Sequence, residues 1–192
     1  MARQKEYDRQ NVLDKAVSLF WKKGYKASSI SDIVHATGLN TASMYKEFGD
    51  KDGLFEEALG HYYQCRLSPI LQILIDEPNI KGIKGYLEYI VNSAASEEYK
   101  GCLMVNSLAE KNVISGQARD QVGTFCVRLE RLLEEAFRNA QANGDVPMSK
   151  DPAVLASFVV CCMHGLVLYG RHPNKANTIR NLYEVIFQIV GE

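Results

Sequence analysis

The sequence predicts an all-α protein of about nine helices, divided into an N-terminal part, residues 1–50, and a larger C-terminal part, residues 51–192. Apolar residues recur at intervals of three and four along most of the chain, which is the spacing of amphipathic helices. The sequence lacks the two-residue alternation of half-buried strands. With 192 residues, 46% hydrophobic and 23% charged, the chain is long enough for a globular protein with a sizeable core.

The first predicted helix runs near residues 8–23. It is followed by Gly24, which stands where a left-handed residue commonly ends a helix. Ser29 and Asp32 have the spacing of a capping box, in which each side chain bonds the other residue's backbone N–H, and they predict a short second helix. The apolar stripe of the first helix consists of Val12, Leu13, Ala16, Leu19 and Phe20.

Two further caps divide the next segment. Asn40 is a suitable N-cap for a third helix over residues 41–47, and Asp50 is one for a fourth helix directly after it. The second and third helices are therefore each about two turns long, and Gly38 lies in the bend between them. A pair of short helices joined in this way predicts a helix-turn-helix motif.

The fourth helix is long and contains Gly60 and Pro69. Proline lacks an amide hydrogen, and its ring crowds the carbonyl of Cys65 four residues earlier, so we expect a kink or a break. The remaining elements are a turn at 76–79, helices over 80–96, 102–111, 116–142, 152–170 and 176–190, and loops at 97–101 and 143–152.

The charge is distributed unevenly along the chain. The net charge is −1, but residues 1–51 carry nine Lys and Arg against six Asp and Glu, whereas the rest carry thirteen against seventeen. A basic N-terminal part on an acidic body favours a nucleic-acid partner for the N-terminal part.

Several classes of protein are not supported by the sequence. No apolar run approaches the roughly 20 residues that span a bilayer, and MARQKEYDRQ has no apolar region typical of a secretory signal, so we expect a cytoplasmic protein without a membrane partner. We find no glycine-rich phosphate loop, no nucleophile motif and no metal-binding spacing among the four His residues, and we therefore expect no enzyme activity, no cofactor and no metal.

The five cysteines follow no disulfide or zinc pattern, because they are scattered and no CxxC occurs. The simpler interpretation is that they are small apolar residues kept reduced. The alternative is a redox sensor built on Cys102, Cys126 or the adjacent Cys161 and Cys162.

The stretch GLNTASMYKEFGDK, residues 38–51, has the composition of a recognition helix. Small side chains at its start allow close approach to base edges, and Tyr and Lys reach phosphates. Lys51 combines its charge with free N–H groups at a helix start, which favours a phosphate. The alternative is a helical hairpin that contacts no nucleic acid. The candidate DNA-binding residues are Thr41, Ala42, Ser43, Tyr45, Lys46 and Lys51.

The segment FWKKGYKASSISDIVHATGLNTASMYKEFGDKDGLF resembles the N-terminal domain of the TetR family of transcription regulators. The resemblance implies a homodimer whose first three helices bind operator DNA, whose fourth helix leads to a ligand-binding body, and whose DNA is released by small molecules. It also implies that the candidate residues above contact DNA and that Ser29 contacts a phosphate. The matching positions are Phe20, Gly24, Tyr25, Ser29, Ile33, Gly38, Tyr45, Phe48, Lys51 and Leu54.

Two residues depart from the family pattern. Glu47 stands where an aromatic residue or His is common, and an acid beside phosphates lowers affinity unless it binds a cytosine amine or pairs with Lys46 or Lys51. Gly53 replaces the acid expected three residues after the Asp50 cap, so we expect fraying at the start of the fourth helix.

The last two helices predict a dimer interface. The stretch AVLASFVVCCMHGLVLYG is apolar on almost every side, so it is expected to be buried on more than one side. Two copies of this helical hairpin form a four-helix interface about a two-fold axis, as in TetR proteins. The alternative is that these faces fill the core of one chain. The interface candidates are Phe158, Cys162, Gly165, Tyr169, Leu182, Ile186 and Ile189.

The inward faces of the fourth to eighth helices predict an effector pocket with few charges, and hence a neutral, mainly apolar or aromatic effector. The alternative for each residue is ordinary core. The predicted function is a repressor released from a palindromic operator by such an effector, and the alternative is a thiol sensor of the same fold. The pocket candidates are Tyr62, Cys65, Tyr86, Tyr89, Ile90, Leu103, Asn106, Ser107, Phe125, Cys126, Leu129, Met163 and Leu166.

Overall fold

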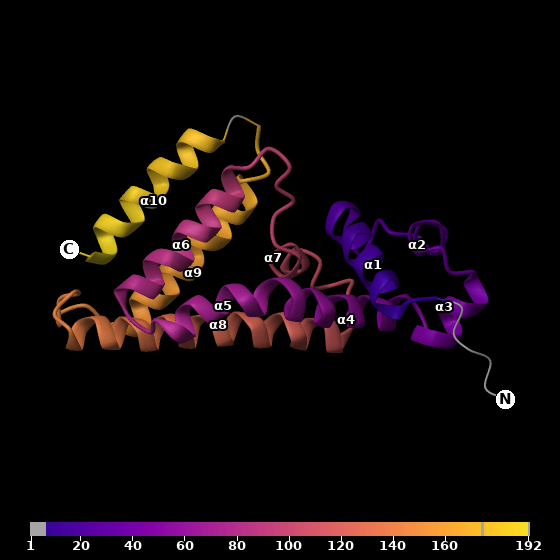
Figure 1. Ribbon diagram of the computed structural model, residues 1–192, viewed down its shortest axis with the longest axis horizontal. Coiled ribbons are helices and arrows are strands. Elements are labelled where there is room, and N and C mark those ends of the chain that lie inside the picture. The colour runs from indigo at the N-terminus through magenta and orange to yellow at the C-terminus, as the bar shows by residue number, and fades with distance from the viewer. Residues whose placement is uncertain (1–6, 174, 192) are drawn as a thin grey trace.

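The computed structural model describes residues 7–173 and 175–191, and all regular structure within these ranges is helical. The molecule is elongated (Figure 1), with α1–α3 at one end and a helical body at the other. The helix α4 (Lys51–Tyr62) leads from the first part into the second and runs beside one end of α8. This arrangement agrees with the predicted all-α fold.

The N-terminal part consists of α1 (Arg9–Lys23), α2 (Ile30–Thr37) and α3 (Thr41–Phe48), close to the predicted bounds. Its caps form as expected, because the Asn40 side chain accepts from the Ser43 N–H, and the capping box of α2 is complete. Three fully buried side chains, Phe20, Ile33 and Met44, join the three helices into one packed unit.

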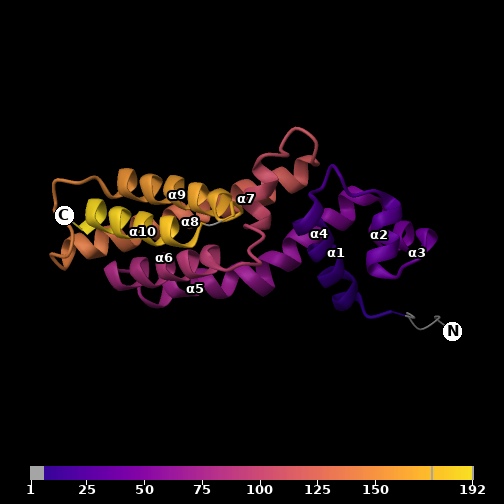
Figure 2. The same cartoon turned by 90° about the horizontal axis from the view of Figure 1, so that it is seen from above.

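The predicted break near Pro69 is present as a π-helical segment. The segment η1 (Tyr63–Leu67) connects α4 to α5 (Ser68–Asp76). The Ser68 N–H donates to the carbonyl of Tyr63, five residues earlier, so the chain accommodates the proline without ending the helix. One predicted helix therefore becomes three segments along one line (Figure 2).

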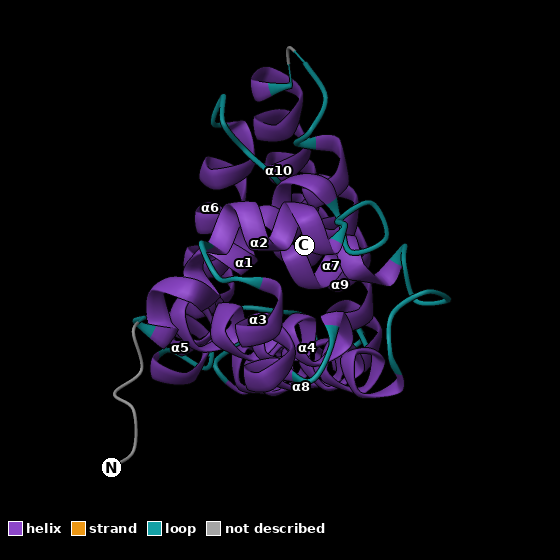
Figure 3. Cartoon of the chain, turned by 90° about the vertical axis from the view of Figure 1, so that its right-hand side faces the viewer, coloured by secondary structure: helices purple, strands orange, loops and turns teal. Residues whose placement is uncertain are grey.

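The body is built from α6 (Ile80–Ala95), α7 (Leu103–Leu108), α8 (Gly116–Ala142), α9 (Pro152–Tyr169) and α10 (Ala176–Gly191). Seen from the end, α5 and α8 form a lower layer, and α6, α9 and α10 lie above it (Figure 3). The helix α7 is shorter than predicted, because the chain turns from Ala109 onward. The bounds of α6, α8, α9 and α10 agree with the prediction to within one or two residues.

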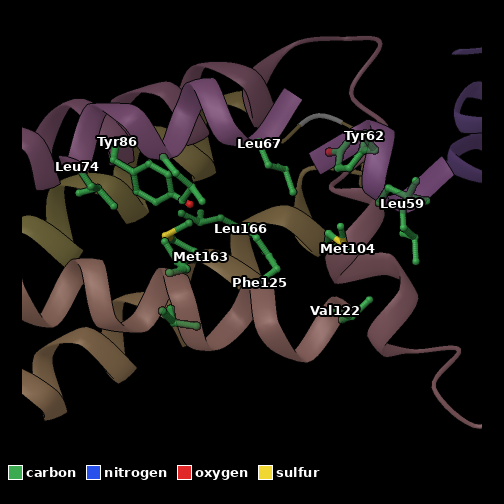
Figure 4. Packing of buried hydrophobic residues seen from close by; sticks show 14 of the residues in the cluster. Leu59, Tyr62, Leu67, Leu74, Tyr86, Met104, Val122, Phe125, Met163 and Leu166 are labelled. Carbon is green, nitrogen blue, oxygen red and sulfur yellow. The ribbon is translucent and has the colours of Figure 1, made fainter. Parts of the chain in front are cut away.

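One continuous hydrophobic core runs through both parts of the molecule. In the body, Leu59, Met104 and Val122 pack beside each other, and Tyr86 and Met163 approach each other from α6 and α9 (Figure 4). Truncating a fully buried Leu to Ala costs about 2–5 kcal/mol in such cores. A shared core means that a displacement in the body reaches the N-terminal helices through packed side chains.

The helix α9 corrects the expectation that no segment approaches the length of a membrane span. Among the described residues it is the one helix that is long and apolar enough to cross a membrane, with 18 residues at a mean hydropathy of 1.9. Only 39% of it is buried within the chain, and Val154, Leu168 and Tyr169 stay exposed. Much of its outer face therefore has no partner among the residues that the structure describes.

Candidate DNA-binding surface and effector cavity

The helix α3 has one buried face and one exposed face. Met44 and Phe48 are buried against the rest of the N-terminal part. Of the predicted contact residues, Thr41, Ala42, Tyr45 and Lys46 are exposed and Ser43 is half-buried. Met44 and Phe48 are four residues apart and therefore lie on the same, inner face of α3. The small side chains at the start of the helix, together with Tyr45 and Lys46, lie on the outer face.

The Lys51 side chain is packed against other residues, and it is less accessible to a phosphate than the sequence suggests. Its ammonium nitrogen lies 4.1 Å from the centroid of the Tyr25 ring, and burial lowers the pKa of Lys51. The Tyr25 hydroxyl in turn donates to Asp52. Lys51 is therefore part of a packed cluster between the end of α1 and the start of α4, at the edge of the surface formed by α3.

Ser29 is exposed, and its hydroxyl is engaged in the cap of α2. It donates to Asp32 Oδ2 at 2.6 Å and accepts from the Asp32 N–H at 3.1 Å. Lys23 Nζ lies 2.6 Å from the same carboxylate and, together with Ser29, holds the pKa of Asp32 far below its usual value. The predicted capping box is confirmed, and the start of α2 is a fixed, solvent-accessible element.

Glu47 does not pair with Lys46 or Lys51 as the sequence suggested. Its carboxylate accepts from Arg9 Nε at 3.0 Å, and the same guanidinium also bonds Glu57. The Glu47 side chain is only 16% exposed. The acid is therefore turned toward α1 and α4 and paired there, so it adds little negative charge to the exposed face of α3.

Gly53 also corrects the sequence interpretation, because the start of α4 is firmly capped. Asp50 Oδ1 accepts from the Gly53 N–H at 2.8 Å. A Cβ at position 53 would lie 2.1 Å from the carbonyl oxygen of Phe48, the last residue of α3. The position excludes any side chain, and glycine allows the end of α3 to approach α4 closely.

The body contains a cavity of about 360 Å³ between α4, α5, α6, α8 and α9. This volume lies in the range of small-molecule sites. Figure 4 shows Tyr62, Leu67 and Phe125 converging on the interior from α4, η1 and α8, respectively. Seven predicted pocket residues line the cavity: Tyr62, Tyr86, Tyr89, Ile90, Phe125, Leu129 and Met163.

Six predicted pocket residues do not line the cavity. Leu103 and Leu166 are core residues, buried at 2% exposure each. Cys65 is exposed and Cys126 is half-exposed. The two remaining polar candidates bond the backbone of their own segment: Asn106 donates to the Lys100 carbonyl and Ser107 to the Leu103 carbonyl. Helical periodicity placed these six residues on inward faces, but it did not show which residues of other segments each side chain contacts.

The sequence prediction missed the loop before α7 and one residue of α1. Tyr99, Gly101 and Cys102 from this loop form one wall of the cavity, and Trp21 from the N-terminal part reaches it as well. Tyr99 and Gly101, an aromatic residue and a glycine within the expected loop at 97–101, were the available signals. The other unpredicted lining residues are Arg66, Leu67, Ile70, Leu71, Ser93, Ser96, Glu98, Lys100, Val105, His164 and Val167.

The polar groups inside the cavity are neutral at physiological pH. Burial raises the pKa of Tyr62, Tyr86 and Tyr99 and lowers the pKa of His164. Burial also raises the pKa of the Cys102 thiol. The charged lining residues are exposed and therefore belong to the mouth: Arg66, Glu98 and Lys100. The interior thus favours an uncharged ligand.

Polar contacts join the body to the N-terminal part. The Glu110 carboxylate accepts from the backbone N–H groups of Tyr25 and Lys26, both at 2.9 Å. His61 Nε2 on α4 lies 2.8 Å from Asp14 Oδ1 on α1, so His61 faces the N-terminal part and is not among the residues that line the cavity.

The outer faces of α9 and α10 carry most of the predicted interface residues. Gly165, Tyr169, Leu182 and Ile189 are exposed. Phe158 and Cys162 are half-buried, and Ile186 is wrongly predicted, since it is 5% exposed and packs into the core of its own chain. Other exposed apolar residues extend the same faces: Val154, Leu168 and Val185.

Comparison with known proteins agrees with this geometry. Residues 12–58 match the profile of bacterial regulatory proteins of the tetR family, and residues 81–185 match a tetracyclin repressor-like C-terminal domain. The chain is 32% identical over 172 residues to the transcriptional repressor ComR of Escherichia coli K12, covering 88% of this chain and 82% of ComR. It is 21% identical to the repressor DhaR of a Mycobacterium species, covering 94% and 90%.

Solved structures show the same fold. A cysteine mutant of the TetR-family regulator CifR, in complex with a 26 bp operator, superposes with a TM-score of 0.77 at 28% identity, covering 95% of this chain and 98% of that one. The reduced form of NemR from E. coli superposes with a TM-score of 0.83 at 20% identity, covering 95% and 96%.

Proposed function

Since the chain belongs to the TetR family of DNA-binding transcriptional repressors, we propose that it acts as a homodimer on a palindromic operator and is released by a small, neutral, mainly aromatic effector. DNA contact is assigned to the exposed face of α3 and to the starts of α2 and α4. The cavity of the body is assigned to the effector. A cytoplasmic location and the absence of catalytic activity are part of the same proposal.

The observation that carries the proposal is the pairing of an outward recognition face with an inward cavity in one chain. Thr41, Ala42, Tyr45 and Lys46 are exposed on a helix whose other face is buried. The cavity of about 360 Å³ has no charged group in its interior. The relative CifR bound to its operator supports the DNA-binding half.

The exposed apolar faces of α9 and α10 support the dimer. Leu168 at 53%, Val185 at 48% and Ile189 at 49% exposure lie on these two faces. Several large exposed apolar side chains on two helices that pack together are typical of protein interfaces. A two-fold dimer places two copies of α3 on successive major grooves when they are about 34–36 Å apart.

The alternative is a regulator of the same fold that responds to thiol oxidation. Two observations favour it: Cys102 lines the cavity, and solved relatives include cysteine mutants of CifR and a reduced form of NemR. Burial raises the pKa of the Cys102, Cys126 and Cys162 thiols, however, which lowers their thiolate fraction and reactivity. We therefore favour the small-molecule effector.

The proposal is tested by selecting bound sequences from random DNA and measuring the dissociation constant of the enriched site. An enriched palindrome is expected. Tyr45→Ala combined with Lys46→Ala should abolish binding without unfolding, because both side chains are exposed. Lys81→Ala, an exposed lysine on α6, is the control and should bind normally. Enrichment of no sequence by the folded protein would refute the proposal.

The dimer and the alternative are tested in the same system. Val185→Glu should yield monomers in sedimentation experiments and weaken operator binding. Retention of the dimer would refute the assigned interface. Peroxide should not release the protein from its operator. If peroxide does release the wild type but not Cys102→Ser, the thiol sensor is established instead.

A further inference from the structure

We propose that Trp21 contacts the effector directly and transmits occupancy of the cavity to the DNA-binding helices, and that the effector is a flat, uncharged aromatic molecule. This inference rests on the proposed function and specifies how the cavity is connected to it. Trp21 is a residue of α1, so the N-terminal part itself supplies a piece of the cavity wall.

The Trp21 side chain makes two contacts with the body at the cavity. Its indole Nε1 donates to the carbonyl of Gly101 at 3.0 Å. Its ring meets the Tyr62 ring edge-on, with centroids 5.0 Å apart. Gly101 and Tyr62 both line the cavity, so a ligand that displaces either residue acts on the indole.

The backbone at Trp21 is held by the packed core of α1, so a force on the indole is passed to the helix. The preceding residue, Phe20, is 1% exposed and packs edge-on against Phe55 of α4, with centroids 4.9 Å apart. The helix α1 also packs closely on α2, through the shared core that includes Ile33. Because packed interiors transmit strain as a unit, a rotation of α1 carries α2 and α3 with it.

The segment Gly101–Glu110, which forms the cavity wall and continues through α7, contacts the N-terminal part at both ends. At one end, the Gly101 carbonyl accepts from Trp21. At the other end, the Glu110 carboxylate accepts from the N–H groups of Tyr25 and Lys26, at the approach to α2. A ligand that shifts this wall therefore acts on the last turn of α1 and on the start of the turn that leads to α2.

The lining of the cavity specifies the chemical class of the effector. Aromatic rings from three helices, Trp21 of α1, Tyr62 of α4 and Phe125 of α8, favour a flat aromatic molecule. His164 Nε2 is buried and has no hydrogen-bond partner within the described residues, which leaves one neutral polar group for the ligand. Charged side chains occur only at the exposed mouth, so a charged ligand would lose its hydration without gaining a partner inside.

Two matched probes test the chemical class and the contact. N-phenylnaphthylamine is aromatic and uncharged, and anilinonaphthalene sulfonate adds one negative charge to the same skeleton. The neutral probe should bind about tenfold more tightly or better, measured by its own fluorescence. Trp21 is the single tryptophan of the chain, so bound probe should shield its emission from the quencher acrylamide. Equal affinity of the two probes, or unshielded Trp21, would overturn the inference.

The transmission is tested by the change in operator affinity that the neutral probe causes. In the wild type, the probe should raise the operator dissociation constant by roughly 5- to 150-fold, the usual range of coupling between sites. Trp21→Phe keeps an aromatic ring but removes the N–H donor. In this variant the probe should bind but should no longer change operator affinity. For each variant, the operator affinity with probe is compared with the operator affinity of the same variant without probe.

Tyr86→Phe, which alters the cavity at a residue of α6 far from α1 in sequence, is the control. It should change probe affinity and keep the coupling factor. Two outcomes would overturn the inference and leave the proposed function standing. In the first, the probe binds beside Trp21 in the wild type but does not alter operator affinity. In the second, the probe lowers the operator affinity of Trp21→Phe as much as that of the wild type. Failure to bind any DNA would refute the proposed function, while the acrylamide measurement would still report the contact.

Discussion

Replacing Gly53 by Ala should destabilise the protein, although alanine is the better helix former. Gly53 lies in the first turn of α4, where Ala would ordinarily stabilise by about 1 kcal/mol. Its Cβ would lie 2.1 Å from the Phe48 carbonyl oxygen, well below the 3.0 Å under which something must shift. Since the obstacle is backbone, the end of α3 must move by roughly 1 Å, which costs about 1–3 kcal/mol in packed structure.

The net effect expected is a loss of about 1–2 kcal/mol in the free energy of unfolding, or about 3–6 °C in Tm for a chain of this size. Because Phe48 anchors the recognition helix, the same shift should weaken operator binding. The assays are urea denaturation at matched protein concentration, since dimer stability depends on concentration, and operator titration.

Gly60→Ala is the matched control for this prediction. Gly60 lies in the same helix, and a Cβ there meets no atom within 4 Å. Its replacement should stabilise the protein by about 0.5–1 kcal/mol. If Gly53→Ala proved as stable as Gly60→Ala, the close approach of α3 to α4 would not constrain position 53, and the reasoning would fail.

Three other predictions concern charge, pH and thiols. Lys46→Ala should weaken binding to all DNA sequences alike and reduce the salt dependence of affinity by about one unit of slope per protomer; an effect on one base position alone would contradict a phosphate contact. Burial raises the pKa of Tyr62, Tyr86 and Tyr99, so their neutral forms favour folding below about pH 10 and this stabilisation is lost as pH rises. Phenolate absorbance should lag behind that of model tyrosine until unfolding, and a normal titration would contradict it. A thiol reagent should modify the exposed Cys65 and, in the monomer, Cys161 before the other three, and rapid labelling of Cys102 would revive the redox alternative.

Local signals in the sequence located most helix boundaries. Ser29 with Asp32, Asn40 and Asp50 form the caps that their spacing predicts. Pro69 correctly indicated an irregularity in the helix. The sequence did not predict that this irregularity is a π-helical segment. These features depend on residues within about five positions of each other, so the chain encodes them without reference to the fold.

Contacts between distant residues were less predictable. Glu47 pairs with Arg9, 38 positions away, although its sequence neighbours offered two lysines. Ile186 shares a periodic stripe with Leu182 and Ile189 but faces the core of its own chain. Periodicity assigns a residue to one side of a helix, but it does not show whether that side meets the same chain or another surface.

The sequence by itself determined the helical class, the short helices of the helix-turn-helix and the membership in a regulator family, because these depend on short-range spacing and on about 50 contiguous residues. Only the tertiary structure decided how the cavity is closed. Trp21 and Gly101 are 80 positions apart, yet they share a hydrogen bond in its wall. Such a contact depends on how α1 and the segment before α7 pack across the shared core, and that packing follows from the shapes of many side chains together, which no local pattern of residues records.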